Sequence, residues 1–261
     1  EDPPIDNNCP SAIAHYKLNS DVEDSTTNNN DLTAVDSPTY PTGGGILLNG
    51  TSQYAHIANL SGDISDLSVF TNFKITSGLT DGEAFCFASE LDTTADERVW
   101  MLLITDVAGG GDGDDLVALR IGHTNGESAV QLLSTFAVQT NVQYSLLATY
   151  DATNDDAHIY IHNLDGEIQN GETGETDATL LDANVQNVED TTFAIGVSFA
   201  DGSPDANRYF DGTIYEVAIY DSEKDQDDAQ DFALQQYSDE TAFEVTGMAA
   251  ASGATMTAAG D

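Results

Sequence analysis

The sequence predicts an all-β protein: a two-sheet antiparallel jelly-roll sandwich with one short helix near the C-terminus. Three observations support this fold class. Roughly a dozen short runs show the apolar alternation, or the continuous apolar stretch, that is typical of strands. Segments rich in Gly, Asn and Asp separate these runs and predict tight turns. Only one segment has apolar residues at helical spacing, which favours a sandwich over a mixed α/β fold.

The expected strands follow one another along most of the chain. They are residues 12–18, 45–50, 54–59, 68–76, 83–89, 98–105, 116–123, 129–135, 144–151, 158–163, 192–199 and 212–221. The expected helix lies within residues 222–238, where Ala229, Phe232, Ala233 and Gln236 fall at helical spacing. We therefore expect one domain over residues 12–237, between a Pro-rich leader (1–11) and a tail of small residues (238–261).

The charge of the chain excludes several classes of partner. Its 261 residues include 46 Asp and Glu but only 6 Lys and Arg, for a formal net charge of −40. Nucleic acids and anionic membrane surfaces would repel such a protein, and no apolar stretch is long enough for membrane insertion. Self-repulsion must be relieved by salt or divalent cations, which is typical of a halophilic or marine source.

The two cysteines and the first residues indicate a secreted protein. The chain starts EDPPIDNNCP, which is typical of a mature N-terminus after removal of a signal or propeptide. In a secreted chain, Cys9 and Cys86 predict one disulfide. The alternative is two unpaired, buried thiols.

Four segments, in order, resemble the laminin G-like family of the concanavalin A-like lectin/glucanase superfamily. They are YKLNSDVEDSTTNNNDLTAV (16–35), ILLNGTSQYAHI (46–57), VQYSLLATYDATNDDAHIYIHN (142–163) and YFDGTIYEVAIYDSEKDQDDAQDFA (209–233). The sequence departs from the family pattern where Leu48 and Asn49 replace Phe and Asp, and where Tyr144 replaces Trp. The resemblance implies a jelly roll and often a structural calcium ion, but no single activity.

The resemblance also implies a first calcium site, because a metal joins the first and last strands in many relatives. Its ligands would be Asp24, Asn28 and Asp31 of the acidic turn and Glu216 near the C-terminus, since calcium prefers carboxylate and amide oxygens. The alternative is that Asp24 and Asp31 cap turns through bonds to the backbone.

A second calcium site is expected in the segment that contains GGDGDDLVA (110–118). Its ligands would be Asp106, Asp112, Asp114 and Asp115, and its glycines permit a tight loop. A solvated acidic loop is the alternative. The segment matches one copy of the calcium-binding β-roll repeat, but a β-roll needs several copies and none follows.

The sequence does not predict an enzyme. Glucanases of the resembling superfamily carry Glu-apolar-Asp-x-x-Glu on one strand, so that two carboxyl groups flank the sugar bond. The nearest match begins at Glu90-Leu91-Asp92 but has Ala95 where the third acid should stand. This segment is also expected to be a loop.

One strand and one tryptophan are candidates for ligand contact. His158, Tyr160 and His162 alternate along HIYIHN and form one face, either a ligand-binding face or a solvent-facing side whose core face is Ala157, Ile159 and Ile161. Trp100 lies in a run that is apolar on both faces, so we expect it in the core. A sugar-stacking surface would then come from tyrosines, with Tyr40, Tyr54, Tyr150 and Tyr209 near expected loops.

Two functions remain open from the sequence. The first is a non-catalytic, calcium-stabilised surface protein that binds glycans or mediates adhesion, with a glycan or surface protein as partner. The second is a structural subunit of an extracellular filament, sheath or capsid surface, in which the leader and tail pack on neighbouring copies.

Overall fold

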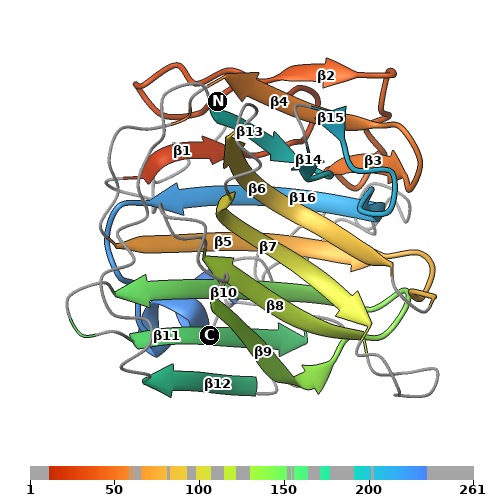
Figure 1. Ribbon diagram of the computed structural model, residues 1–261. Helices are drawn as coiled ribbons and strands as arrows, with labels where there is room; N and C mark the ends of the chain where they lie inside the picture. The colour runs from red at the N-terminus through yellow and green to blue at the C-terminus, as the bar shows by residue number, and fades with distance from the viewer. Residues whose placement is uncertain are drawn as a thin grey trace, which may run out of the picture.

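The computed structural model is a sandwich of two antiparallel sheets, and Figure 1 shows the second sheet in front of the first. It describes residues 12–58, 60, 66–80, 83–92, 98–106, 115–121, 130–151, 154, 156–163, 171–176, 191–200 and 203–233. The predicted fold class is confirmed. Within these residues, no helix has both the length and the apolar character that crossing a membrane requires.

The first sheet has the strand order β1-β16-β5-β10-β11-β12, and β3 also pairs with β16. Its strands are β1 (Ala12–Tyr16), β3 (Ile46–Asn49), β5 (Leu67–Ile75), β10 (Gln143–Asp151), β11 (Asp156–Asn163), β12 (Gly171–Thr176) and β16 (Asp211–Tyr220). β1 and β16, the first and last strands along the chain, lie side by side in this sheet, and Tyr16 is paired with Val217.

The second sheet has the order β2-β4-β13-β6-β7-β8-β9. Its strands are β2 (Thr33–Val35), β4 (Tyr54–Ala58), β6 (Ala84–Asp92), β7 (Arg98–Asp106), β8 (Asp115–Ile121), β9 (Val130–Ala137) and β13 (Thr191–Ile195). The short strands β14 (Phe199–Ala200) and β15 (Ser203–Pro204) form a separate pair. The sequence did not predict β2, β12, β14 or β15, because each is too short or too polar to show an apolar alternation.

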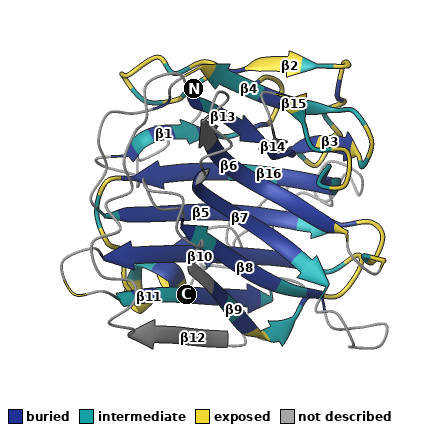
Figure 2. Ribbon diagram, viewed as in Figure 1, coloured by how far each residue is buried: buried dark blue, intermediate teal, exposed yellow. Residues whose placement is uncertain are grey.

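Aromatic side chains from both sheets fill the space between them, and most strand residues are buried (Figure 2). Phe73 of β5 contacts Phe87 of β6 with ring centroids 4.4 Å apart, and Tyr144 of β10 stacks on Phe73 at 5.6 Å. Trp100 is fully buried in this core, as predicted. Each such side chain contributes about 1.5–3 kcal/mol through burial, which makes this layer the main source of stability.

A short helix over residues 226–233 covers part of the outer face of the first sheet. Asp225 caps it, since its carboxylate accepts hydrogen bonds from the main-chain nitrogens of Asp227 and Asp228 at 2.9 and 3.0 Å. Phe232 stacks on Phe70 of β5 with centroids 4.4 Å apart. The predicted helix is therefore confirmed for these residues, while 234–238 lie outside the described part.

Gly212 allows the segment DGTIYEVAIY, which forms β16, to begin very close to β5. Its φ is +149°, and a Cβ atom at this position would lie 2.2 Å from the carbonyl oxygen of Lys74 and 2.9 Å from the Cα of Ile75. Only glycine allows β16 to approach β5 this closely at the start of the strand.

Candidate functional site

After β13 the chain leaves the second sheet and enters β16 of the first sheet at Asp211, and the excursion between them builds the candidate site. Gly196 donates a hydrogen bond from its nitrogen to the oxygen of Phe87, and its own oxygen accepts one from Phe210, each at 2.9 Å. The φ of Gly196 is +87°, and a Cβ there would lie 2.3 Å from Cδ1 of Leu48. The described residues 197–200 and 203–209 therefore lie outside the sheet, on its outer face.

Polar contacts hold this excursion against β6. The hydroxyl of Ser89 donates to the oxygen of Val197 at 3.1 Å, the nitrogen of Ala84 donates to Asn207 at 3.2 Å, and the nitrogen of Cys86 donates to Arg208 at 3.4 Å. Beneath it lies a small apolar cluster formed by Ala84, Cys86, Met101, Leu103, Ala118, Ala194, Val197 and Phe199. Loops that a rigid sheet holds in this way commonly carry binding residues.

Four rings gather where the excursion meets β4, and we call them the aromatic cluster: Tyr54, His56, Phe199 and Tyr209. Tyr54 lies at the centre, with centroids 5.5 Å from His56, 5.8 Å from Phe199 and 6.2 Å from Tyr209. Both tyrosines are partly exposed. Burial, followed by the charge of Asp36, raises the pKa of the Tyr54 hydroxyl, and burial, followed by Tyr54 and Asp36, raises that of Tyr209. Neutral tyrosine rings with a polar tip are suited to stacking on sugar rings and to hydrogen bonding with their hydroxyls.

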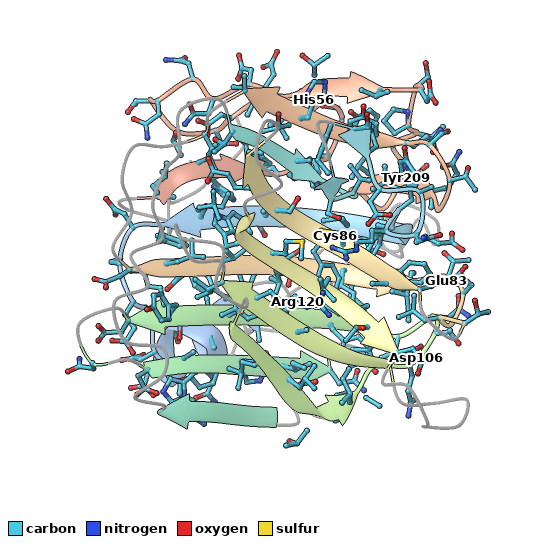
Figure 3. The ribbon with its side chains drawn as sticks, in the orientation of Figure 1. His56, Glu83, Cys86, Asp106, Arg120 and Tyr209 are labelled. Carbon is cyan, nitrogen blue, oxygen red and sulfur yellow. The ribbon has the colours of Figure 1, made fainter. Side chains whose placement is uncertain are left out.

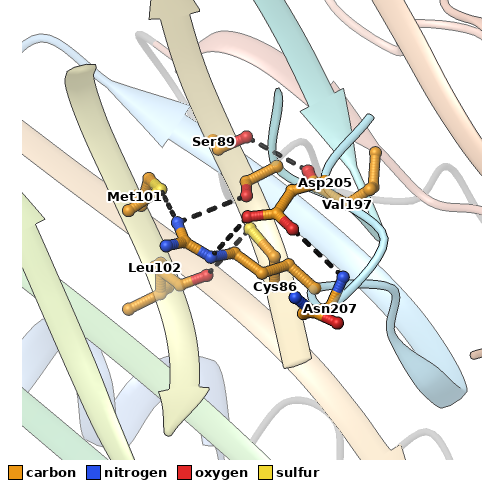
Figure 4. Close-up of polar contacts among 9 residues, drawn as sticks. Cys86, Ser89, Met101, Leu102, Val197, Asp205 and Asn207 are labelled. Atoms are coloured by element: carbon orange, nitrogen blue, oxygen red, sulfur yellow. Dashed lines mark hydrogen bonds and ion pairs between the residues drawn. The ribbon is translucent and has the colours of Figure 1, made fainter. Parts of the chain in front are cut away.

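Arg208 lies beside the aromatic cluster and is held in place by Asp205. Its Nε forms an ion pair with the carboxylate of Asp205 at 3.1 Å, and its Nη1 contacts Sδ of Met101 at 3.4 Å and Oγ of Ser198 at 3.5 Å (Figure 4). Asp205 is itself oriented by the nitrogen of Asn207 at 3.1 Å. The guanidinium is therefore fixed in position by one strong contact and two weak ones.

A second arginine lies on the same face. Arg120 of β8 is the antiparallel partner of Met101 of β7, whose sulfur contacts Arg208. Figure 3 shows His56, Cys86, Arg120 and Tyr209 on this face. Two of the six cationic side chains of the whole molecule thus lie close together here.

Cys86 lies beneath these arginines as a fully buried thiol. Burial raises its pKa to about 12, while the charges of Arg208 and Arg120 act in the opposite direction. A thiol with this pKa stays protonated and does not act as a nucleophile. The predicted disulfide to Cys9 stays a prediction, because Cys9 lies outside the described residues.

At the first predicted calcium site, Asp24 closes the acidic turn through hydrogen bonds. Its Oδ1 accepts from the nitrogens of His15 and Thr26, at 3.0 and 2.9 Å, and its Oδ2 accepts from the hydroxyl of Thr26 and the nitrogen of Asn30, at 2.8 and 3.0 Å. Asp31 accepts from the nitrogen of Asp24 at 2.9 Å. Although burial raises the pKa of Asp24, these hydrogen bonds outweigh it and hold the pKa below its usual value.

The other two predicted ligands point to different partners. The amide of Asn28 donates to the oxygen of Ile13 at 2.8 Å. Glu216 contacts the ring of His15, with Oε1 2.5 Å from Nε2, and accepts a long hydrogen bond of 3.4 Å from Asn72. His15 therefore links the two parts of the predicted site, through its backbone to Asp24 and through its ring to Glu216.

The second predicted calcium site is described only at its ends. Asp106 and Asp115 are antiparallel partners at the ends of β7 and β8, whereas Asp112 and Asp114 lie outside the described residues. In the described ranges, no three His, Cys, Asp or Glu side chains are grouped so that they could hold a metal ion. Because calcium also accepts amide and carbonyl oxygens, its binding at either site stays a prediction.

The predicted face of β11 is buried. Tyr160 and His162 are 6% and 2% exposed, and Tyr160 packs with Phe232 of the helix, so the expectation of a solvent-facing side is wrong. The helix at residues 226–233 packs over this face of β11, although the local alternation alone suggested that the face would be in contact with water. His158 is partly exposed and lies 3.1 Å from the carboxylate of Asp156. Ligand binding by this row stays a prediction.

Glu90 lies on strand β6, and the expectation of a loop is wrong here. A bulge in β6 turns both Phe87 and Ala88 toward the core, so Glu90 also points inward and is 1% exposed. It accepts hydrogen bonds from Thr191 at 2.9 Å and from Nε1 of Trp100 at 3.3 Å, while burial raises its pKa. A carboxyl group in this position cannot reach a substrate, so the nearest glucanase-like residue is not placed for catalysis.

Sequence reasoning found only part of the candidate site. Tyr54 and Tyr209 were two of four tyrosines that it could not rank, and a third, Tyr150, is fully buried. Arg208, Asp205 and Phe199 were missed. The DGSPD turn at 201–205 was a usable signal, because it interrupts a strand-like run just before a cation and two aromatic residues.

Comparisons with known proteins agree with this architecture. A laminin G-like family model, described as the Concanavalin A-like lectin/glucanases superfamily, matches residues 34–230. Domain 4 of AbnA, an extracellular GH43 arabinanase from Geobacillus stearothermophilus solved with arabinotriose, is similar with a TM-score of 0.52 at 20% identity, covering 85% of this chain and 98% of that one. The CBM40 of the Ruminococcus gnavus IT-sialidase, bound to α2,3-sialyllactose, gives a TM-score of 0.50 at 15% identity, covering 64% and 81%. No curated protein matches the chain.

Proposed function

Because the chain belongs to the concanavalin A-like lectin/glucanases superfamily, we propose that it is a non-catalytic module that binds a glycan on the outer face of its second sheet. The observation that carries this proposal is the aromatic cluster beside Arg208. Partly exposed tyrosines at 6.2 Å from one another, next to a fixed ion pair, offer both stacking surfaces and hydrogen-bond donors and acceptors. The two similar structures support the fold, and each was solved with an oligosaccharide.

The proposal extends to an extracellular setting and to calcium as a structural ion. Both rest on the acidic composition, the two cysteines and the carboxylates of the turn at residues 20–32. Assembly into a filament or sheath, with the leader and tail packed on neighbouring copies, has less support, because the aromatic cluster offers a surface suited to glycan binding. In addition, side chains of the acidic turn close the outer edge of β1, which would otherwise accept another strand.

The test is a screen of the full-length chain against immobilised glycans, followed by calorimetry on those that bind. We expect Tyr54→Ala and Tyr209→Ala each to weaken binding by about 10-fold or more, because sugar stacking on an aromatic ring depends on that ring. Tyr215→Ala is the matched control, since Tyr215 is a partly exposed tyrosine on the first sheet. Equal loss in all three variants, or none, would contradict this location.

A second readout separates binding from assembly. Deleting residues 241–261 should leave glycan affinity unchanged if the outer face of the second sheet is the site. Light scattering at high salt, with calcium and then with a chelator, tests the alternative: particles far larger than the 27.7 kDa chain that disperse on chelation would favour an assembly subunit.

A further inference from the structure

The positive charges on the second sheet point to a more specific ligand class. The chain carries a net charge of −40, yet Arg208 and Arg120 lie close enough to Cys86 that both charges act on its thiol. Met101 lies between them: its sulfur contacts Nη1 of Arg208, and its Cα is paired with that of Arg120. Two positive charges are therefore concentrated at one place on an otherwise strongly acidic chain.

Asp205 forms an ion pair with Arg208 but occupies only one edge of its guanidinium. It contacts Nε, while Nη1 meets only a thioether and a hydroxyl at 3.4 and 3.5 Å, and no hydrogen bond from Nη2 is seen within the described ranges. A guanidinium has five N–H donors arranged as a planar fork that matches a carboxylate. The Nη edge of Arg208 is therefore available to a charged acceptor, and its side chain is 19% exposed.

The opposite end of the site has the opposite charge. Asp36 directly follows Val35, whose Cα is paired with that of Tyr54, so a carboxylate lies near the aromatic cluster. An anionic group would be repelled from that end and attracted to the arginine end. The charge of the site is therefore asymmetric: a carboxylate lies near the aromatic cluster at one end, and the two arginines lie at the other end.

We propose, on the basis of the glycan-binding function above, that the ligand is an acidic sugar whose carboxylate binds Arg208 beside Arg120 while its neutral part stacks on the aromatic cluster. Long-range repulsion from the acidic surface is screened at high salt, where the Debye length falls to about 3 Å at 1 M. Recognition at short range then depends on the two arginines.

The experiment compares sugars that differ only in the acid group. The full-length chain is titrated in 1 M NaCl with oligogalacturonate and its methyl ester, with 3′-sialyllactose and its methyl ester, and with a sulfated galactan oligosaccharide and its desulfated form. We expect at least one carboxylate sugar to bind about 10-fold or more tightly than its uncharged counterpart. Arg208→Gln should remove this preference, measured as the ratio between the affinities of this one variant for the acidic sugar and for its uncharged counterpart.

Two further variants keep the result interpretable. Lys224→Gln removes the same charge on the other sheet, where Lys224 lies 4.9 Å from the ring of Tyr220, and should leave the preference intact. Arg208→Lys keeps the charge and should retain less than half of the preference, because lysine lacks the planar fork. If Arg208→Gln fails to fold, this variant and the paired sugars on the native chain still give the test.

The outcomes separate the inference from the function on which it rests. Equal binding of acid and ester, or tighter binding of the ester, overturns the acidic ligand and leaves glycan binding intact. A preference for the sulfated sugar alone overturns the carboxylate. If no sugar binds, in this set or in the glycan screen, the proposed function fails and the inference fails with it.

Discussion

The carboxylate of Asp24 accepts a hydrogen bond from the main-chain nitrogen of His15, 3.0 Å away across nine residues of chain. The nitrogen of Ser25 donates in turn to the oxygen of His15 at 2.8 Å, and the amides of Asn28 and Asn30 donate to the oxygen of Ile13. The acidic turn thereby satisfies the backbone groups along the outer edge of β1, which protects an edge strand from pairing with another chain.

Replacing Asp24 with Asn tests this arrangement. The amide nitrogen of Asn cannot accept the hydrogen bonds that one carboxylate oxygen of Asp24 now accepts, so we expect a loss of about 1–2 kcal/mol in the free energy of unfolding. Since the folded pKa of Asp24 is lowered, its contribution is present above the unfolded pKa and is lost as the pH falls through the folded pKa.

The same denaturation curves, measured with EGTA and with calcium, examine the predicted ion. The hydrogen bonds need no metal, so the loss in Asp24→Asn should persist in EGTA. Calcium bound at this turn would add a calcium-dependent part to the loss. An effect of Asp24→Asn that vanishes entirely in EGTA would mean that the ion, and not the hydrogen bonds, holds the turn.

Glu90→Gln should change the pH dependence of stability. Burial raises the folded pKa of Glu90, so the folded state holds a proton that the unfolded state releases, and stability decreases as the pH rises above the unfolded value of about 4.3. Gln carries no charge, so the variant should gain stability relative to the native chain between pH 4 and pH 8. Glu90→Ala should instead lose about 2–4 kcal/mol, because it removes the buried carboxyl group that accepts hydrogen bonds from Trp100 Nε1 and Thr191. A flat difference between Glu90→Gln and native would refute the raised pKa.

His162→Gln should show the opposite trend. His162 is 2% exposed, and its Nδ1 has no hydrogen-bond partner among the described residues. Burial lowers its pKa, so the folded state resists protonation and native stability decreases as the pH falls below about 6.5. We expect the variant to gain stability relative to native between pH 7 and pH 5 in urea denaturation. A difference between His162→Gln and the native chain that stays constant from pH 7 to pH 5 would contradict the lowered pKa.

Gly212→Ala should be among the most damaging single substitutions. The added Cβ would lie 2.2 Å from the oxygen of Lys74, which is main chain and cannot move without disturbing the pairing of β16 with β5. We expect a loss of about 3 kcal/mol or more in the free energy of unfolding. Gly43→Ala is a matched control, because nothing lies within 4 Å of its Cβ position, and it should change stability by less than about 0.5 kcal/mol. Similar values for both variants would show that β16 tolerates a side chain there.

The sequence by itself determined the longer strands and, for several of them, which side chains face the core. Alternation in HIYIHN placed Ala157, Ile159 and Ile161 in the core, and the apolar run around Trp100 placed that residue there too. These predictions succeeded because a strand side chain points to one face or the other with a period of two, which is a local property of the chain. The start of the helix at Asp225 is also a local property, because its carboxylate caps the main chain only a few residues later.

The tertiary structure alone decided the site. The bulge at Phe87 shifts β6 by one residue and turns Glu90 into the core, although local alternation gives no sign of the shift. The glycine at 196 sends the chain out of the sheet, which brings Arg208 onto Met101, 107 residues earlier. The aromatic cluster likewise joins β4 to residues 199–209. Such contacts depend on strand register and on which loop crosses which face, and both are set by pairing between distant segments rather than by neighbours in the sequence.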